Sequence, residues 1–131
     1  MSPSLLAALV SAIGLVAACR GDALPVNGTR LVEAPIESVE VVPVLAVRVQ
    51  YSARIVSALP NGCHTYHDAE VVRRGAVIDV TVHNAIPVRA DLACTQLYGT
   101  VEHTIDLGTD FTPGATYRLN ANGHAVTFTA W

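Results

Sequence analysis

Residues 117–129 read YRLNANGHAVTFT, and this stretch does most to decide the fold. Two runs of alternating apolar and polar residues, 117–121 and 125–129, flank the dipeptide Asn122-Gly123. An Asn-Gly pair between alternating runs is the strongest short-range signal of a β-hairpin, because both central residues of the tight turn need a positive φ. The stretch therefore predicts two antiparallel strands.

Similar short runs, separated by turn residues, extend back from this hairpin to residue 36. Further strands are expected at 36–42, 47–55, 66–73, 76–84 and 97–107, with a hairpin across Arg74-Gly75 and a longer loop at 85–96. Valine, isoleucine and threonine supply 33 of the 113 residues after residue 18, and branching at Cβ suits a pleated strand better than a helix. About seven strands at this spacing predict an all-β fold, an antiparallel β-sandwich, with a small barrel as the alternative.

The end of the chain also resembles a known domain class. Phe111-Thr112-Pro113-Gly114-Ala115-Thr116-Tyr117, followed by Leu119, Asn122-Gly123 and Phe128, resembles the closing strands of immunoglobulin-like domains in bacterial surface proteins. The resemblance implies an immunoglobulin-like β-sandwich. The sequence departs from antibody-type domains, since no cysteine follows Tyr117 by two positions and the only tryptophan is Trp131.

A second resemblance concerns a larger part of the chain. Residues 50–130 resemble small bacterial lipoproteins of uncharacterised function, which share a Leu-Pro-x-Gly-Cys turn and a later Ala-Cys-Thr. Here these motifs are Leu59-Pro60-Asn61-Gly62-Cys63 and Ala93-Cys94-Thr95. This resemblance implies a location and a fold, and no activity.

The first 18 residues indicate export. They contain 13 hydrophobic residues and no charged side chain. The apolar run 5–18 is shorter than the roughly 20 residues that span a bilayer, and it fits the apolar part of a secretory signal, although the usual basic start is missing. Leu15-Val16-Ala17-Ala18-Cys19 resembles a bacterial lipobox, in which Cys19 is lipidated and becomes the first mature residue. A plain secretory signal with a chance cysteine is the alternative.

These features divide the chain into three parts. Residues 1–18 are expected to be a signal peptide, residues 19–35 the lipidated cysteine with a flexible tether, and residues 36–131 the sandwich domain. The tether is predicted because residues 20–35 contain prolines and glycines without apolar periodicity. The protein is then expected to be exported and held at a cell-envelope membrane by its lipid, facing the periplasm or the outside.

Cys63 and Cys94 remain once Cys19 carries the lipid. An even pair of cysteines in an exported domain most simply forms a disulfide. By chain entropy, a loop of about 32 residues closed in this way stabilises the fold by roughly 3–4 kcal/mol. Two free thiols that bind a metal are the alternative.

Three histidines suggest a metal site. His64 and His67 lie three residues apart beside Cys63, and His103 could add a ligand from another strand. Neutral imidazoles suit zinc or copper, but the spacing matches no named metal motif. Apart from this candidate ion, no cofactor is expected.

Composition excludes several functions. The chain has 131 residues, a net charge of −3 and no lysine, which argues against nucleic-acid binding and rules out a lysine nucleophile. No serine lies in a Gly-x-Ser-x-Gly elbow, so an enzyme is not expected.

The function expected from the sequence is that of a non-catalytic binding or structural module with an envelope or extracellular partner. Its candidate surface is the pair of loops 60–68 and 85–96, and its candidate contacts are His64, Tyr66, His67 and Asp91. An envelope metal-binding protein and a proteinase inhibitor are the alternatives. The oligomeric state stays open.

Overall fold

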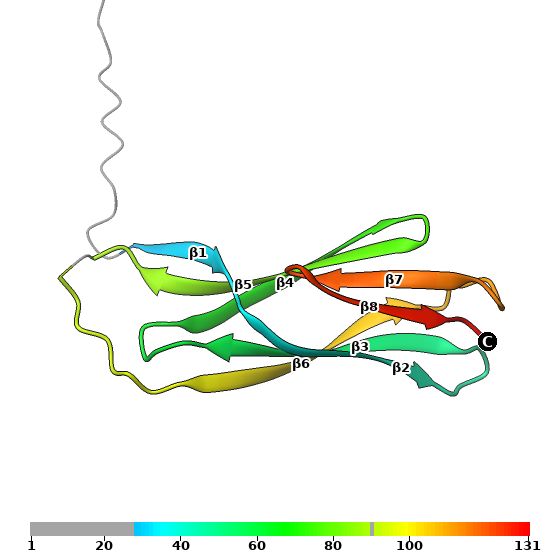
Figure 1. Cartoon of the computed structure of the whole chain (residues 1–131), viewed down its shortest axis with the longest axis horizontal. Helices are drawn as coiled ribbons and strands as arrows, with labels where there is room; N and C mark the ends of the chain where they lie inside the picture. The colour runs from blue at the N-terminus through cyan, green and yellow to red at the C-terminus, as the bar shows by residue number, and fades with distance from the viewer. Residues whose placement is uncertain (1–27, 90) are drawn as a thin grey trace, which may run out of the picture.

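The computed structural model describes residues 28–89 and 91–131, which form a β-sandwich of eight strands (Figure 1). In chain order the strands are β1 (Thr29–Glu33), β2 (Ile36–Val44), β3 (Gln50–Leu59), β4 (Thr65–Arg74), β5 (Val77–Pro87), β6 (Gly99–Gly108), β7 (Thr116–Ala121) and β8 (His124–Thr129). One sheet contains β1, β4, β5, β7 and β8, and the other has the order β2-β3-β6. The predicted all-β sandwich is therefore confirmed, with eight strands instead of about seven. No helix in the described part of the chain is long and apolar enough to cross a membrane.

Both predicted hairpins form. In the β7–β8 hairpin Ala121 pairs with His124, and the two turn residues have positive φ values, 44° at Asn122 and 86° at Gly123. In the β4–β5 hairpin Arg74 pairs with Val77, and Gly75 has a φ of 60°. Local turn chemistry thus decides both connections.

Several strand boundaries differ from the sequence prediction. β3 begins at Gln50 instead of residue 47, because the pair Val44–Gln50 ends the β2–β3 ladder and residues 45–49 close the hairpin. β5 continues to Pro87, because β1 and β4 both pair with its last residues. The following loop therefore covers residues 88–98.

The tether prediction is wrong for residues 29–35, since β1 belongs to the sandwich. Thr29–Glu33 pairs antiparallel with the last residues of β5, and Ala34 is only 1% exposed. The side chain of Asn122 holds the segment after β1 in place, because its Nδ2 donates to the carbonyl of Ala34 at 2.8 Å. The sequence could not reveal β1, since the strand exposes most of its side chains and depends on pairing with a distant strand.

The expectation of purely antiparallel pairing is wrong at one position. β5 and β7 are parallel, with Val77 opposite Arg118 and Val80 opposite Ala121. After β5 the chain crosses to the other sheet as β6 and then returns. A crossover of this kind allows β7 to run beside β5 in the same direction.

The core fills the space between the two sheets. Its fully buried side chains come from alternate positions of the strands, as expected for β3, where Tyr51, Ala53 and Ile55 are buried. The core cluster consists of Ala34, Ala53, Ile55, Ile78, Val80, Val82, Leu119 and Ala121.

A second cluster, around Tyr51 and Tyr117, closes the end of the sandwich near the C-terminus. The hydroxyl of Tyr117 accepts a hydrogen bond from the backbone N–H of Thr112 at 2.8 Å. This bond has the geometry of the tyrosine corner found in immunoglobulin-like sandwiches.

Candidate functional site: the disulfide end

The disulfide Cys63–Cys94 joins the two loops that the sequence singled out. Cys63 follows β3 in the loop 60–64, and Cys94 lies in the loop 88–98, with 5.3 Å between their Cα atoms. We call these two loops the disulfide end. The chain enters the sandwich at the same end, where the N–H of Val88 donates to the carbonyl of Gly28 at 3.0 Å (Figure 1).

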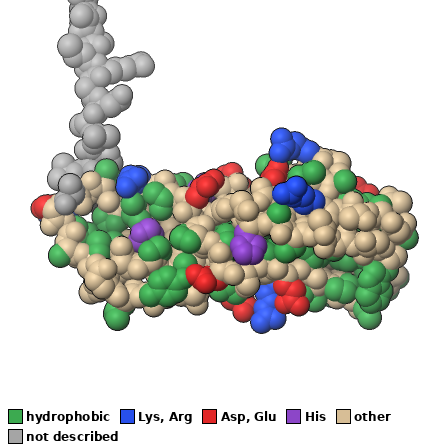
Figure 2. Space-filling view, viewed as in Figure 1, with side chains coloured by type: hydrophobic (Ala, Val, Ile, Leu, Met, Phe, Trp, Pro, Cys, Tyr) green, Lys and Arg blue, Asp and Glu red, His purple; other side chains and the backbone are tan. Residues whose placement is uncertain are grey.

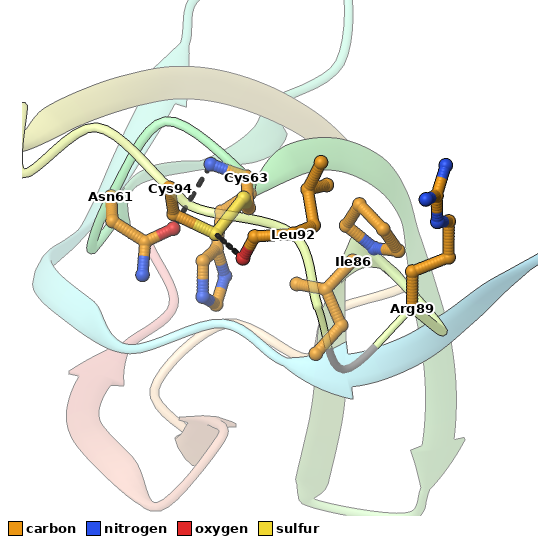
Figure 3. A pocket seen from close by; sticks show the side chains of 8 residues that line it. Asn61, Cys63, Ile86, Arg89, Leu92 and Cys94 are labelled. Carbon is orange, nitrogen blue, oxygen red and sulfur yellow. Dashed lines mark hydrogen bonds between the residues drawn. A yellow bond between two sulfur atoms is a disulfide. The ribbon is translucent and has the colours of Figure 1, made fainter.

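Backbone contacts also hold the two loops together. The N–H of Gly62 donates to the carbonyl of Thr95 at 2.9 Å. The Oδ1 atom of Asn61 accepts the N–H of Cys63 at 2.9 Å, the local bond that makes Asn favourable in turns (Figure 3). The disulfide and these bonds together pre-organise the loops.

Two cavities flank the disulfide. One of about 120 Å³ is lined by Asn61, Cys63, His64, Ile86, Pro87, Arg89, Leu92 and Cys94 (Figure 3). The other, of about 440 Å³, shares Cys63, Pro87, Leu92 and Cys94 with it and also reaches Thr29. The walls are thus partly apolar, and the smaller cavity is also lined by one cationic residue, Arg89.

His64 and Asp91, both predicted contact residues, lie at this end. The Nδ1 atom of His64 is buried and has no hydrogen-bond partner among the described residues. Asp91 binds Arg89 through two hydrogen bonds, of 3.2 Å to Nε and 3.1 Å to Nη2. The bond from Arg89 lowers the pKa of the Asp91 carboxyl, so this pair stays ionised at neutral pH.

Tyr66 and His67 lie on β4 instead of in the loop. The ring of Tyr66 stacks on the imidazole of His103, with 4.1 Å between the ring centroids, where the edges of the two sheets meet. His67 occupies a register shift in β4 and is exposed beside Asp68, at 3.8 Å from its carboxylate. These two side chains therefore do not line the cavities at the disulfide.

The predicted metal ligands are not brought together. Within residues 28–89 and 91–131, no three His, Cys, Asp or Glu side chains form a group that could hold a metal ion, so His64, His67 and His103 do not form the expected set. His103 lies on the inner side of β6, where its Nε2 and the Oγ of Ser57 are 2.9 Å apart. Both cysteines are oxidised in the disulfide, which removes the thiol alternative.

The Ser57–His103 pair resembles a hydroxyl–imidazole couple of a hydrolase only in composition. Ser57 is 0% exposed, so its hydroxyl cannot reach a substrate. Burial also lowers the pKa of His103, which keeps the imidazole neutral inside the sandwich. The pair links the side chains of β3 and β6, which are neighbours in the same sheet.

Sequence reasoning missed Arg89 and Leu92. Arg89 provides the cation of the site, and Leu92 lines both cavities while remaining 45% exposed. The only available signal was the position of both residues in the loop before Cys94. An exposed apolar residue in a loop does not by itself indicate a site.

The opposite end of the sandwich carries a separate apolar surface. Its exposed members are Val44, Leu45, Val47 and Trp131. Figure 2 shows hydrophobic side chains gathered at this end, where the C-terminus lies. A substitution on this surface can therefore serve as a control for the same substitution at the disulfide end.

The fold and the site define a β-sandwich protein with one disulfide-braced end. A family model described as the ORF11 beta-sandwich domain matches residues 53–130, and the chain belongs to this family. The match covers Cys63 and Cys94, most of β3, and the strands from β4 to β8. No curated protein and no solved structure matches the chain.

Proposed function

We propose that the protein is an exported bacterial lipoprotein, anchored through Cys19, that acts as a non-catalytic binding module at the cell envelope. Cys19 and the signal segment 1–18 lie outside the described residues. The observation that best supports export is the Cys63–Cys94 disulfide, because disulfides persist mainly in oxidising compartments outside the cytosol.

The disulfide end is the proposed binding surface. Its loops are cross-linked and therefore lose little conformational entropy when a partner binds. The loop 88–98 carries exposed apolar side chains as well as the charged pair Arg89–Asp91, a combination found in protein interfaces. These side chains are Val88, Leu92, Leu97 and Tyr98.

Few residues separate the proposed anchor from the sandwich. Because β1 starts at Thr29, the segment between Cys19 and the sandwich is much shorter than the predicted tether. Fully extended, nine residues span at most about 30 Å. The proposed partner is therefore a protein or ligand that is itself present at the membrane surface.

The binding surface is tested with two matched variants of the full chain. Leu92→Arg places a charge at the disulfide end, and Leu45→Arg places the same charge at the opposite end. We expect Leu92→Arg to reduce capture of the partner from envelope membranes by about tenfold or more, and Leu45→Arg to leave it unchanged. Equal capture by both variants, or loss with Leu45→Arg alone, would contradict the proposed surface.

The same capture experiment separates the alternatives. A captured protease that the protein inhibits would favour the proteinase inhibitor over a general binding module. The anchor is tested on its own with Cys19→Ala, which we expect to release the protein from membranes or to block its maturation. Membrane association equal to that of the wild type would contradict lipidation at Cys19.

A further inference from the structure

The end of the sandwich opposite the disulfide presents an apolar tip. Residues 44–48, at the connection between β2 and β3, are all exposed. In the described part of the chain, three of the four most exposed large apolar side chains lie at this end, Val47 at 105%, Leu45 at 72% and Trp131 at 67%. Val47 therefore projects into solvent and does not line a groove. We call residues 44–48 together with Trp131 the apolar tip.

The fold holds Trp131 beside the connection between β2 and β3 (Figure 1). Its N–H donates to the hydroxyl of Tyr51 at 3.0 Å, and Tyr51 lies opposite Pro43 in the β2–β3 ladder. The ring of Tyr51 packs against Phe111 and Phe128, with centroid distances of 4.9 and 5.2 Å. The second core cluster thus supports both parts of the apolar tip and keeps them together.

The residue types of the apolar tip suit the surface of a lipid bilayer. Leucine and valine side chains gain free energy when they move from water into an apolar medium. Tryptophan favours the boundary between acyl chains and headgroups, because its indole combines an apolar ring with an N–H donor. Arg48 is the only charged residue in the segment 41–49, VVPVLAVRV, and a guanidinium can bind phosphate through two hydrogen bonds.

The distribution of acidic residues and the shape of this end also favour a bilayer. Asp106 lies on β6 opposite Ser52, and Asp110 lies in the loop between β6 and β7, so both are outside the apolar tip. The tip itself contains no carboxylate side chain that anionic headgroups would repel. A protein partner needs a groove that matches a projecting side chain such as Val47, whereas a bilayer can deform around it.

We propose that the apolar tip inserts into the surface of a bilayer that contains anionic lipids. Leu45 and Val47 enter the outer part of the acyl region, Trp131 lies at the headgroup boundary, and Arg48 binds a lipid phosphate. The anchor proposed at Cys19 belongs to the other end of the sandwich. In an anchored molecule the bilayer at the apolar tip is therefore a second membrane that faces the first, and the sandwich connects the two.

The test uses the fluorescence of Trp131, which is the only tryptophan of the chain and so reports this end alone. The full chain, carried on plain phosphatidylcholine vesicles if it is lipidated, is mixed with a second set of vesicles. These contain equal parts of phosphatidylglycerol and of phosphatidylcholine brominated on its acyl chains. We expect the emission to shift to shorter wavelength and to be quenched, because bromine quenches an indole that reaches the acyl region. Unbrominated vesicles should give the shift without the quenching.

Matched variants locate the contact. Leu97 lies at the disulfide end and is 74% exposed, nearly the same as Leu45. Leu45→Asp should weaken binding to the second vesicles by about tenfold or more, and Leu97→Asp should leave it unchanged. Arg48→Gln should weaken binding by about fivefold, and only when the vesicles contain phosphatidylglycerol. All three side chains are exposed, so the substitutions leave the core intact.

Several outcomes would overturn the proposal. These are a wild-type emission that brominated vesicles do not quench, quenching that persists in Leu45→Asp, and equal losses in Leu45→Asp and Leu97→Asp. A shift that grows with protein concentration without vesicles would instead assign the apolar tip to a second copy of the chain. The outcomes for Cys19→Ala and for the disulfide end concern the proposed function alone, because neither alters the apolar tip.

Discussion

The sequence suggested His103 as a metal ligand, but the tertiary structure gives this residue other contacts. It lies on the inner side of β6, stacked on Tyr66 and bonded to Ser57. Burial lowers the pKa of its imidazole below the usual value of about 6.5. The unfolded chain therefore binds a proton at this residue at a higher pH than the folded chain does.

This difference predicts a pH-dependent stability. The contribution of neutral His103 is fully present above about pH 6.5 and is lost as the pH falls toward the lowered pKa of the folded state. In urea unfolding below and above that pH, we expect His103→Gln to lose less stability on acidification than the wild type. The control His124→Gln changes an exposed residue at the start of β8 and should keep the wild-type dependence. Identical dependences for His103→Gln and the wild type would contradict this role.

At the scale of elements, the turn between β7 and β8 has a second task that its sequence did not reveal. The Nδ2 atom of Asn122 donates to the carbonyls of Ala34 at 2.8 Å and Val82 at 2.9 Å. Its Oδ1 accepts the N–H of Val82 at 3.1 Å. The turn residue therefore ties the hairpin to β5 and to the crossing from β1 to β2.

Replacing Asn122 separates these two tasks. Asn122→Gly keeps the positive φ but removes the side-chain bonds, and we expect it to lower the free energy of unfolding by about 1–3 kcal/mol. Asn122→Asp keeps the shape but faces two carbonyl oxygens with a carboxylate, so the loss should be larger at neutral pH. Equilibrium urea unfolding measures both. A neutral effect of Asn122→Gly would mean that the turn acts only through its φ angle.

At the scale of the whole molecule, the proposed anchor at Cys19 predicts an orientation of the sandwich at the membrane. Gly28 enters at the disulfide end, and Leu45 lies in the loop at the other end. In membranes that contain the lipidated protein, a fluorophore at Leu97→Cys should lie nearer to a bilayer-surface acceptor than one at Leu45→Cys. Nine extended residues allow Gly28 to lie at most about 30 Å from the bilayer surface, so energy transfer from the first position should be the stronger of the two. Equal transfer from both positions would contradict this orientation.

Much of this architecture followed from local patterns. The Asn-Gly and Arg-Gly turns, the excess of β-branched residues and the two domain cysteines were sufficient to predict the hairpins, the all-β sandwich and the disulfide. The turn and strand signals act over short range. The disulfide was predictable because, outside the cytosol, a cysteine usually pairs with another cysteine. The predictions for residues 1–27 rest on sequence alone.

Only the tertiary structure decided the remaining features. β1 lacks an alternating pattern and exists because a distant strand supplies its hydrogen bonds. The parallel β5–β7 pair depends on the route of β6 through the other sheet. The three histidines are separated because His64 lies in a loop, whereas His67 and His103 lie on strands of different sheets. Strand partners and side-chain contacts depend on residues far apart in the chain, so the composition and the spacing of a single segment do not determine them.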